Sequence, residues 1–241
     1  TQQIAPLFDN LGGYKYPITT KNIMSQTFFN QGLNLAYAFN HSESHRSFME
    51  AARLDPSCAM SYWGQAYVLG PNINDQLPDK ERRDKSYEAV QKAKKLAAGS
   101  SKKEQALINA LTFRYCKDSV AITELNIAYM NEMAKVAKTY SNDADVLTLY
   151  AAAIMNTVPW AYWDKEGNPS PNIKEAKLAL EKAMEININH PGANHYYIHM
   201  VELPKPDIGV PSADRLGSLM PGAGHMVHMP GHIYMRVGRY E

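Results

Sequence analysis

The stretch FFNQGLNLAYAFNHSESHRSFMEAARLDPS, residues 28–57, has segments of helical period on either side of a polar turn. Gly32 and Ala51 are small enough to let two helices approach each other closely, and Phe48 is large enough to fill the space between them. Pro56 lacks a backbone donor and therefore ends the second segment. The stretch predicts a helical hairpin.

The same plan recurs along the chain. Its small and large residues at fixed points resemble the tetratricopeptide repeat, a helix–turn–helix of about 34 residues that stacks into a superhelix. The second, third and fourth predicted pairs are residues 59–70 with 86–98, residues 103–116 with 121–140, and residues 143–156 with 172–187. We therefore predict an all-α fold, a tetratricopeptide-like right-handed superhelix of helical hairpins.

The end of the chain fits this plan. A fifth pair opens at residues 191–203 and closes with a short segment at 211–220, and a sixth opens at HIYMRVGRYE, residues 232–241. Because a lone amphipathic helix would expose its apolar face, we expect the natural protein to continue past Glu241. The prediction is one α-solenoid domain over residues 1–241, with an N-terminal extension over residues 1–20.

Two insertions are longer than an ordinary turn, and loops of this kind are often functional. They are GPNINDQLPD, residues 70–79, and VPWAYWDKEGNPSP, residues 158–171. Trp160, Tyr162 and Trp163 are costly to expose together, since each aromatic side chain can bury on the order of 150–250 Å². We expect both insertions to fold against the concave groove. The charged run at 79–85 alternates in sign and predicts a solvated first helical turn.

Composition excludes several classes of function. The formal net charge is +1, so charge alone favours neither nucleic acid nor a membrane surface. No apolar run approaches the roughly 20 residues that cross a bilayer, and the first residues lack the features of a signal peptide. Cys58 and Cys116 are expected to be buried thiols, with a single disulfide as the alternative.

Five of the eight histidines fall within 38 residues, between positions 195 and 232. His195 and His199 are four residues apart on a predicted helix, so that both imidazoles share one face and suit one metal ion. Glu202 lies one turn further on, where it can coordinate or accept a hydrogen bond from a ligand.

The second histidine group precedes or begins the next predicted first helix. Pro230 suits an initial helical turn, which places His232 in that turn and His225 and His228 in the loop before it. Because adjacent first helices touch in a solenoid, we predict that the two groups face each other and converge on a transition-metal site. Zinc is the first choice for an all-imidazole site, and copper follows if a methionine sulfur joins.

Other polar residues have weaker signals. Asp214, Tyr196 and Glu202 are the candidates for acid, base or orienting roles. His41 and His45 are expected to straddle an inter-helix turn in a structural role, and His190 to cap a helix or lie on the surface. Most of the methionines near the histidines are expected to pack in the core; they are Met200, Met220, Met226, Met229 and Met235.

Four longer segments of the sequence resemble a group of exported bacterial proteins that contain tetratricopeptide repeats. They are FNQGLNLAYAFNHSESHRSFMEAARLDPSCAMSYWG, LGPNIN, HPGANHYYIHMVE and PGAGHMVHMPGHIYMRVGRYE. The resemblance implies a helical solenoid and export to a compartment such as the periplasm, and it implies no reaction. The shared pattern includes six histidines: His41, His195, His199, His225, His228 and His232.

Three functions therefore remain open. The groove can bind a transition metal for catalysis on a small molecule, it can hold a peptide as a metal-free interaction scaffold, or it can capture and deliver metal without chemistry. The chain has no HExxH, P-loop, GxSxG or EF-hand motif. The sequence leaves the substrate, the partner and the oligomeric state undetermined.

Overall fold

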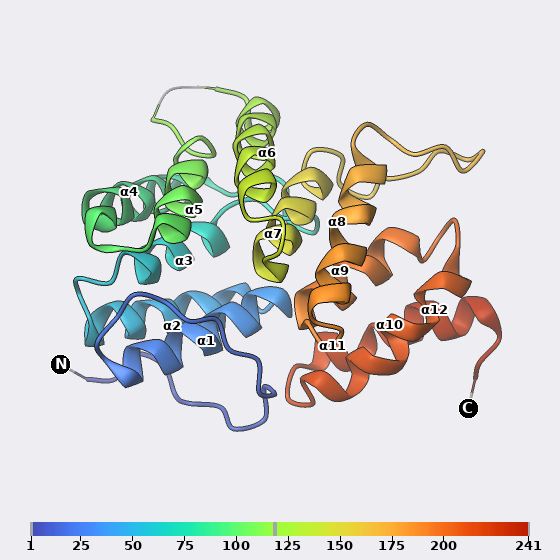
Figure 1. Cartoon of the computed structure of the whole chain (residues 1–241), viewed down its shortest axis with the longest axis horizontal. Coiled ribbons are helices and arrows are strands. Elements are labelled where there is room, and N and C mark those ends of the chain that lie inside the picture. Colours follow the sequence, from blue (N-terminus) through green and yellow to red (C-terminus); the bar gives the residue numbers. More distant parts are fainter. Residues whose placement is uncertain (1, 118–119, 241) are drawn as a thin grey trace.

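The computed structural model describes residues 2–117 and 120–240, and its regular elements there are helices (Figure 1). The helices are α1 Ile23–Tyr37, α2 His41–Leu54, α3 Ala59–Leu69, α4 Lys80–Leu96, a short 3-10 helix η1 Ala97–Gly99, α5 Lys102–Thr112, α6 Ile122–Thr139, α7 Ala144–Met155, α8 Ile173–Ile186, α9 Pro191–Val201, α10 Pro206–Leu219, α11 Gly224–His228 and α12 Pro230–Val237. Consecutive helices pack against each other in pairs. The described ranges contain no sheet, only two isolated bridges, and the all-α prediction is confirmed.

The first hairpin forms as its sequence predicts. Asn22 and Asn40 cap α1 and α2, because their side-chain oxygens accept hydrogen bonds from backbone N–H groups of the first turn. Phe48 of α2 is fully buried between two glycines. A Cβ atom added to Gly32 of α1 would lie 2.8 Å from the Phe48 ring, and one added to Gly64 of α3 would lie 2.4 Å from it. The ring therefore requires glycine on both neighbouring helices.

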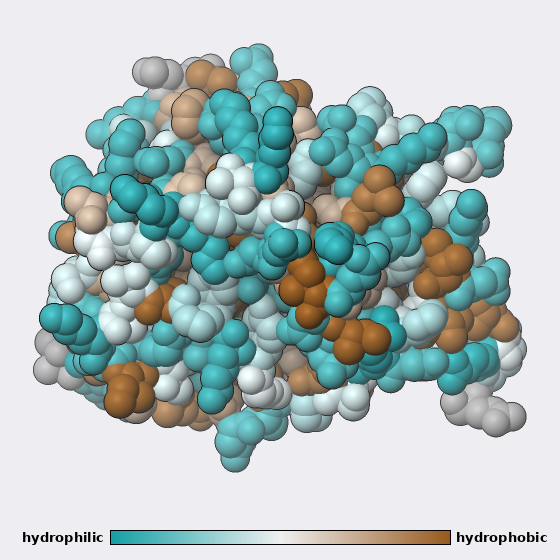
Figure 2. Space-filling model, in the orientation of Figure 1, coloured by the Kyte–Doolittle hydropathy of each residue, from teal (hydrophilic) through white to brown (hydrophobic). Residues whose placement is uncertain are grey.

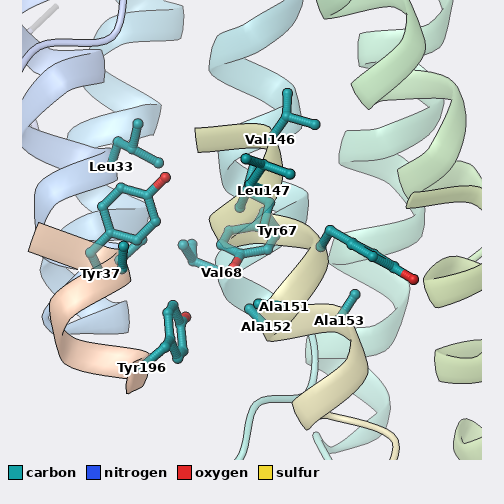
Figure 3. Close-up of a cluster of buried hydrophobic side chains, with 14 of the residues drawn as sticks. Leu33, Tyr37, Tyr67, Val68, Val146, Leu147, Ala151, Ala152, Ala153 and Tyr196 are labelled. Carbon is teal, nitrogen blue, oxygen red and sulfur yellow. The ribbon is translucent and has the colours of Figure 1, made fainter. Parts of the chain in front are cut away.

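The first helices of successive pairs contact one another, α1 with α3, α3 with α5, and α7 with α9. The chain also curls far enough for α9 to contact α1. Every residue of α7 and α9 is buried as a result. Figure 3 shows the hydrophobic cluster between these helices, to which Tyr37, Tyr67 and Tyr196 contribute their rings.

The N-terminal extension packs on the helices. Tyr14 donates its hydroxyl hydrogen to Asp145 of α7, at 2.6 Å, and Gly222 donates its backbone N–H to the carbonyl of Asn10, at 2.8 Å. Buried Asp145 also accepts hydrogen bonds from Tyr37 Oη, at 2.7 Å, and from His190 Nε2, at 3.2 Å. This network joins the extension, α1, α7 and the start of α9.

The charged run forms the exposed start of α4, as predicted, since this helix begins at Lys80 and Asp79 caps it. The helix begins earlier than residue 86, where the second segment of this pair was predicted to start. The partner of α9 is a full helix, α10, that begins at Pro206 and continues through Pro211, so the predicted short segment is wrong. Cys58 is a buried free thiol, which excludes the disulfide.

The surface is mainly polar on the face shown in Figure 2, where hydrophobic residues form small separate groups. In the described part of the chain, no helix combines the length and the apolar character needed to cross a membrane.

Candidate metal centre

Helix α9 carries the first histidine pair in a fully buried position. His190 caps the helix, since its Nδ1 accepts a hydrogen bond from Ala193 N, at 3.0 Å. His190 is also completely buried against Asp145, which confirms the capping prediction and excludes the surface alternative. His195 and His199 follow one turn apart, and their ring centroids lie 4.8 Å from each other.

The second histidine group lies on two short helices beside α9. Pro230 begins α12 and His232 lies in its first turn, as predicted. The prediction that His225 and His228 lie in a loop is wrong, because both belong to α11. Met229 between the two helices keeps a right-handed helical backbone conformation, so His228 and His232 remain neighbours one turn apart.

Three imidazoles from these elements form the first candidate ligand set. One nitrogen each from His195, His199 and His225 lie within 4.8 Å of one another. His195 Nε2 and His225 Nε2 are 3.0 Å apart. His199 Nε2 is buried and has no hydrogen-bond partner. The prediction that His195, His199 and a residue of the second group converge is confirmed.

Hydrogen bonds behind the rings fix which nitrogens carry lone pairs. The carbonyl of Tyr37 can only accept, so His195 Nδ1 donates its hydrogen to it, at 2.6 Å. The carboxylate of Glu202 likewise accepts from His199 Nδ1, at 3.4 Å. The Nε2 atoms of His195 and His199 are therefore unprotonated in the neutral rings, which is the form that coordinates a metal.

Glu202 connects this set to the second one. Its other oxygen accepts from His232 Nδ1, at 2.7 Å, and Arg236 lies 3.6 Å from the same oxygen. His199, Glu202 and His232 thus form a second group of donor atoms that could hold a metal ion, and it shares His199 with the first group.

The electrostatic environment favours the neutral form of the His195, His199 and His225 rings and the charged form of the Glu202 carboxylate. Burial, followed by the nearby His199, lowers the pKa of His225 to about 4 and that of His195 well below its usual range. Burial opposes ionisation of Glu202, but the hydrogen bonds from His199 and His232 outweigh it and lower the pKa of this carboxyl. Neutral imidazoles beside a carboxylate are suited to bind a cation.

Phe39 is a part of the site that the sequence did not indicate. It has a left-handed backbone, with φ 56°, and its ring lies against three of the histidines, with centroid distances of 4.5 Å to His195, 5.7 Å to His199 and 5.3 Å to His225.

The prediction that His41 and His45 straddle a turn is wrong, because α2 begins at His41 and carries both. The His41 ring stacks on the ring of Phe39, with centroids 5.8 Å apart.

A pocket of about 560 Å³ opens beside His199 and Glu202. The aromatic insertion forms its other wall. Trp163 Nε1 donates to the carbonyl of Met200, at 2.7 Å, and the rings of Trp160 and His199 are perpendicular, with centroids 5.2 Å apart. Trp160 is 44% exposed and Tyr162 only 3%. The expectation that these rings avoid joint exposure is confirmed, and they pack on α9.

The predicted residues Asp214 and Tyr196 belong to neither donor group. Asp214 accepts hydrogen bonds from Tyr234 Oη, at 2.7 Å, and Arg239, at 2.8 Å. Tyr196 is buried next to His195 in the cluster of Figure 3, where burial raises the pKa of its phenol well above the usual range. Of the five nearby methionines, four are buried, as expected, and Met235 is exposed.

Comparison with known proteins adds no relative. No family model matches the chain, and no curated protein matches its sequence. The arrangement of the site is therefore the basis for the functional argument.

Proposed function

We propose that this protein is a metal-dependent enzyme in which His195, His199 and His225 hold one transition-metal ion, with zinc preferred to copper. One observation carries the proposal: His199 Nε2 is an unprotonated nitrogen, buried without a partner, beside two further imidazole nitrogens. A buried polar atom without a hydrogen bond is destabilising by about 1–3 kcal/mol. An ion at this position satisfies it.

The hydrogen bonds behind the ligands support the same conclusion. Ligating histidines in metal sites donate their other N–H to a carboxylate or a backbone carbonyl. His195 has a carbonyl of Tyr37 in this role and His199 has the carboxylate of Glu202. The rings are thus held in the ligating orientation by contacts that do not involve the ion.

Catalysis is supported by the number of ligands and by the pocket. Three protein ligands leave the fourth position of a tetrahedral zinc ion open, which is the arrangement of catalytic rather than structural sites. The pocket along Trp160, His199 and Glu202 has room for a small molecule beside the ligand His199. When bound, the ion would supply Lewis acidity or an activated water. Glu202 would orient His199 and hold its N–H proton.

The fold and setting belong to the same proposal. We infer that the hairpins form a right-handed superhelix of the tetratricopeptide type, supported by the contacts between successive first helices. The resemblance of the histidine-bearing segments to exported bacterial proteins supports a role outside the cytoplasm, in a compartment such as the periplasm. A peptide-binding scaffold without metal, and metal delivery without chemistry, are the alternatives that the experiment must separate.

Metal analysis of the purified protein tests the proposal. We expect near-stoichiometric zinc after growth in a medium that contains both zinc and copper, and its loss in His225→Ala. His45→Ala is the matched control, because His45 is a partly buried histidine of α2 outside both donor groups. Absence of metal in the wild-type protein, even after incubation with zinc or copper, would leave the scaffold as the function. A substrate screen with and without chelator then separates catalysis from delivery.

A further inference from the structure

A second pair of imidazoles faces the solvent near the buried set. His228 is exposed on α11 and His232 is partly exposed on α12. Their Nε2 atoms lie 2.9 Å apart, and their rings are nearly perpendicular, with centroids 4.8 Å from each other. The pair uses residues that the three-histidine set does not.

The tautomers of this pair follow from Glu202. Because the carboxylate accepts the hydrogen of His232 Nδ1, at 2.7 Å, His232 Nε2 carries a lone pair directed at His228. One proton, on His228 Nε2, then occupies the space between the two rings. A divalent cation can take the place of that proton when the proton moves to His228 Nδ1 through the solvent, because both rings then coordinate as neutral ligands through Nε2.

The separation of the nitrogens suits a shared ion. Two nitrogens at about 2.05 Å from a tetrahedral ion lie about 3.3 Å from each other. The His228 and His232 nitrogens, at 2.9 Å, need to part by only about 0.4 Å to reach that distance. The exposed side chain of His228 can make this movement without disturbing the core.

The exposed pair also lies at the outer end of a row of histidines. Ring centroids are separated by 4.8 Å from His228 to His232, by 5.8 Å from His232 to His199, and by 4.8 Å from His199 to His195. Exposure falls along the row, from exposed His228 to fully buried His195. An ion that leaves one ring of the row therefore has the next imidazole nearby as its following ligand.

We propose that His228 and His232 form a second, exchangeable site for a divalent transition-metal ion, through which the buried site is loaded. Imidazole pairs suit zinc, copper and nickel. With two protein ligands, the remaining positions are filled by water, and this site binds more weakly than the three-histidine set. The ion at the surface therefore exchanges with solvent and supplies the buried one.

Zinc titration of the metal-free full chain, with a chromophoric chelator as competitor, tests this proposal. We expect two ions per wild-type chain, one tight and one weak. His228→Ala should lose the weak ion, retain the tight one, and load it more slowly in a stopped-flow measurement. His45→Ala, the control, should keep both ions and the wild-type loading rate.

The outcomes separate the two proposals. One tight ion in both wild type and His228→Ala, loaded at the same rate, would overturn the surface site and leave the buried site intact. A weak ion without a tight one would support the surface site and overturn the buried one. One ion per wild-type chain that is lost in His228→Ala, with circular dichroism unchanged, would show a single shared site and overturn the separate surface site.

Discussion

Replacement of Glu202 by glutamine tests how the candidate ligands are held. The carboxylate accepts one hydrogen bond from His199 Nδ1, at 3.4 Å, and one from His232 Nδ1, at 2.7 Å. Glutamine has the same size but only one acceptor oxygen, and its amide group is a donor. In Glu202→Gln, one imidazole N–H therefore faces another donor and loses its fixed orientation.

The size of the effect follows from this loss. Removing the hydrogen-bond partner of a ligating histidine lowers metal affinity about 10- to 100-fold, which equals about 1.4–2.8 kcal/mol of binding free energy. The ligands themselves remain, so binding is weakened and not abolished. We expect the dissociation constant of the buried zinc ion to rise within that range, with the stoichiometry unchanged.

Competition titration with a chromophoric chelator measures this change. Asp214→Asn is the matched control, because Asp214 also accepts two hydrogen bonds, from Tyr234 and Arg239, but belongs to neither donor group. Its zinc affinity should equal that of the wild type. Wild-type affinity in Glu202→Gln would refute the argument that the carboxylate holds the ligands in place.

Three further predictions concern the fold and the metal. Gly64→Ala places a Cβ 2.4 Å from Phe48 and should lower the free energy of unfolding by about 1–3 kcal/mol. Gly217→Ala on α10 is the control, because the nearest atom to its Cβ is 3.6 Å away, and it should not lower this free energy. Equal denaturant midpoints for the two variants would contradict the prediction. Burial opposes ionisation of Asp145, but hydrogen bonds led by that of His190 lower its pKa. The charged Asp145 therefore stabilises the fold fully above the unfolded-state pKa of about 3.9, and this stabilisation is lost as the pH falls through the lower folded value. The difference in free energy of unfolding between wild type and Asp145→Asn should narrow below about pH 4. A difference that stays constant with pH would count against the network. Chelation of zinc should lower the thermal midpoint without changing the far-UV circular dichroism. From a state with free zinc at 100 times its dissociation constant, the loss of stability is equivalent to about 2.7 kcal/mol. Loss of the helical signal would mean that the site forms only with metal.

The helices and the convergence of the histidines could be predicted from local pattern. Phe48 with Gly32 indicated the packing of the first hairpin, and the spacing of His195 and His199 placed both rings on one face. Pro230 located the start of α12 correctly. The error over His225 and His228 has a local cause: Pro230 indicates the start of a helix, which suggested a loop before it, yet residues Gly224–His228 form a short helix of their own.

Contacts between distant parts of the chain could not be predicted in this way. The hydrogen bond from His195 to the carbonyl of Tyr37 joins residues 158 positions apart, and a backbone carbonyl has no signature in the sequence. The left-handed conformation of Phe39 belongs to the local end of α1, where Phe39 N and Asn40 N donate to the carbonyls of Ala36 and Leu35, whereas the position of its ring among the histidines depends on the meeting of α1 with α9.

The sequence by itself determined the helical period, the hairpin pairs and which histidines share a helix face, because these depend on neighbours within a few residues. Only the tertiary structure decided which ring nitrogens are unprotonated, which of them is buried without a partner, and that an aromatic pocket opens beside them. The physical reason is that protonation and burial depend on groups brought close by folding, which the order of residues along the chain does not specify.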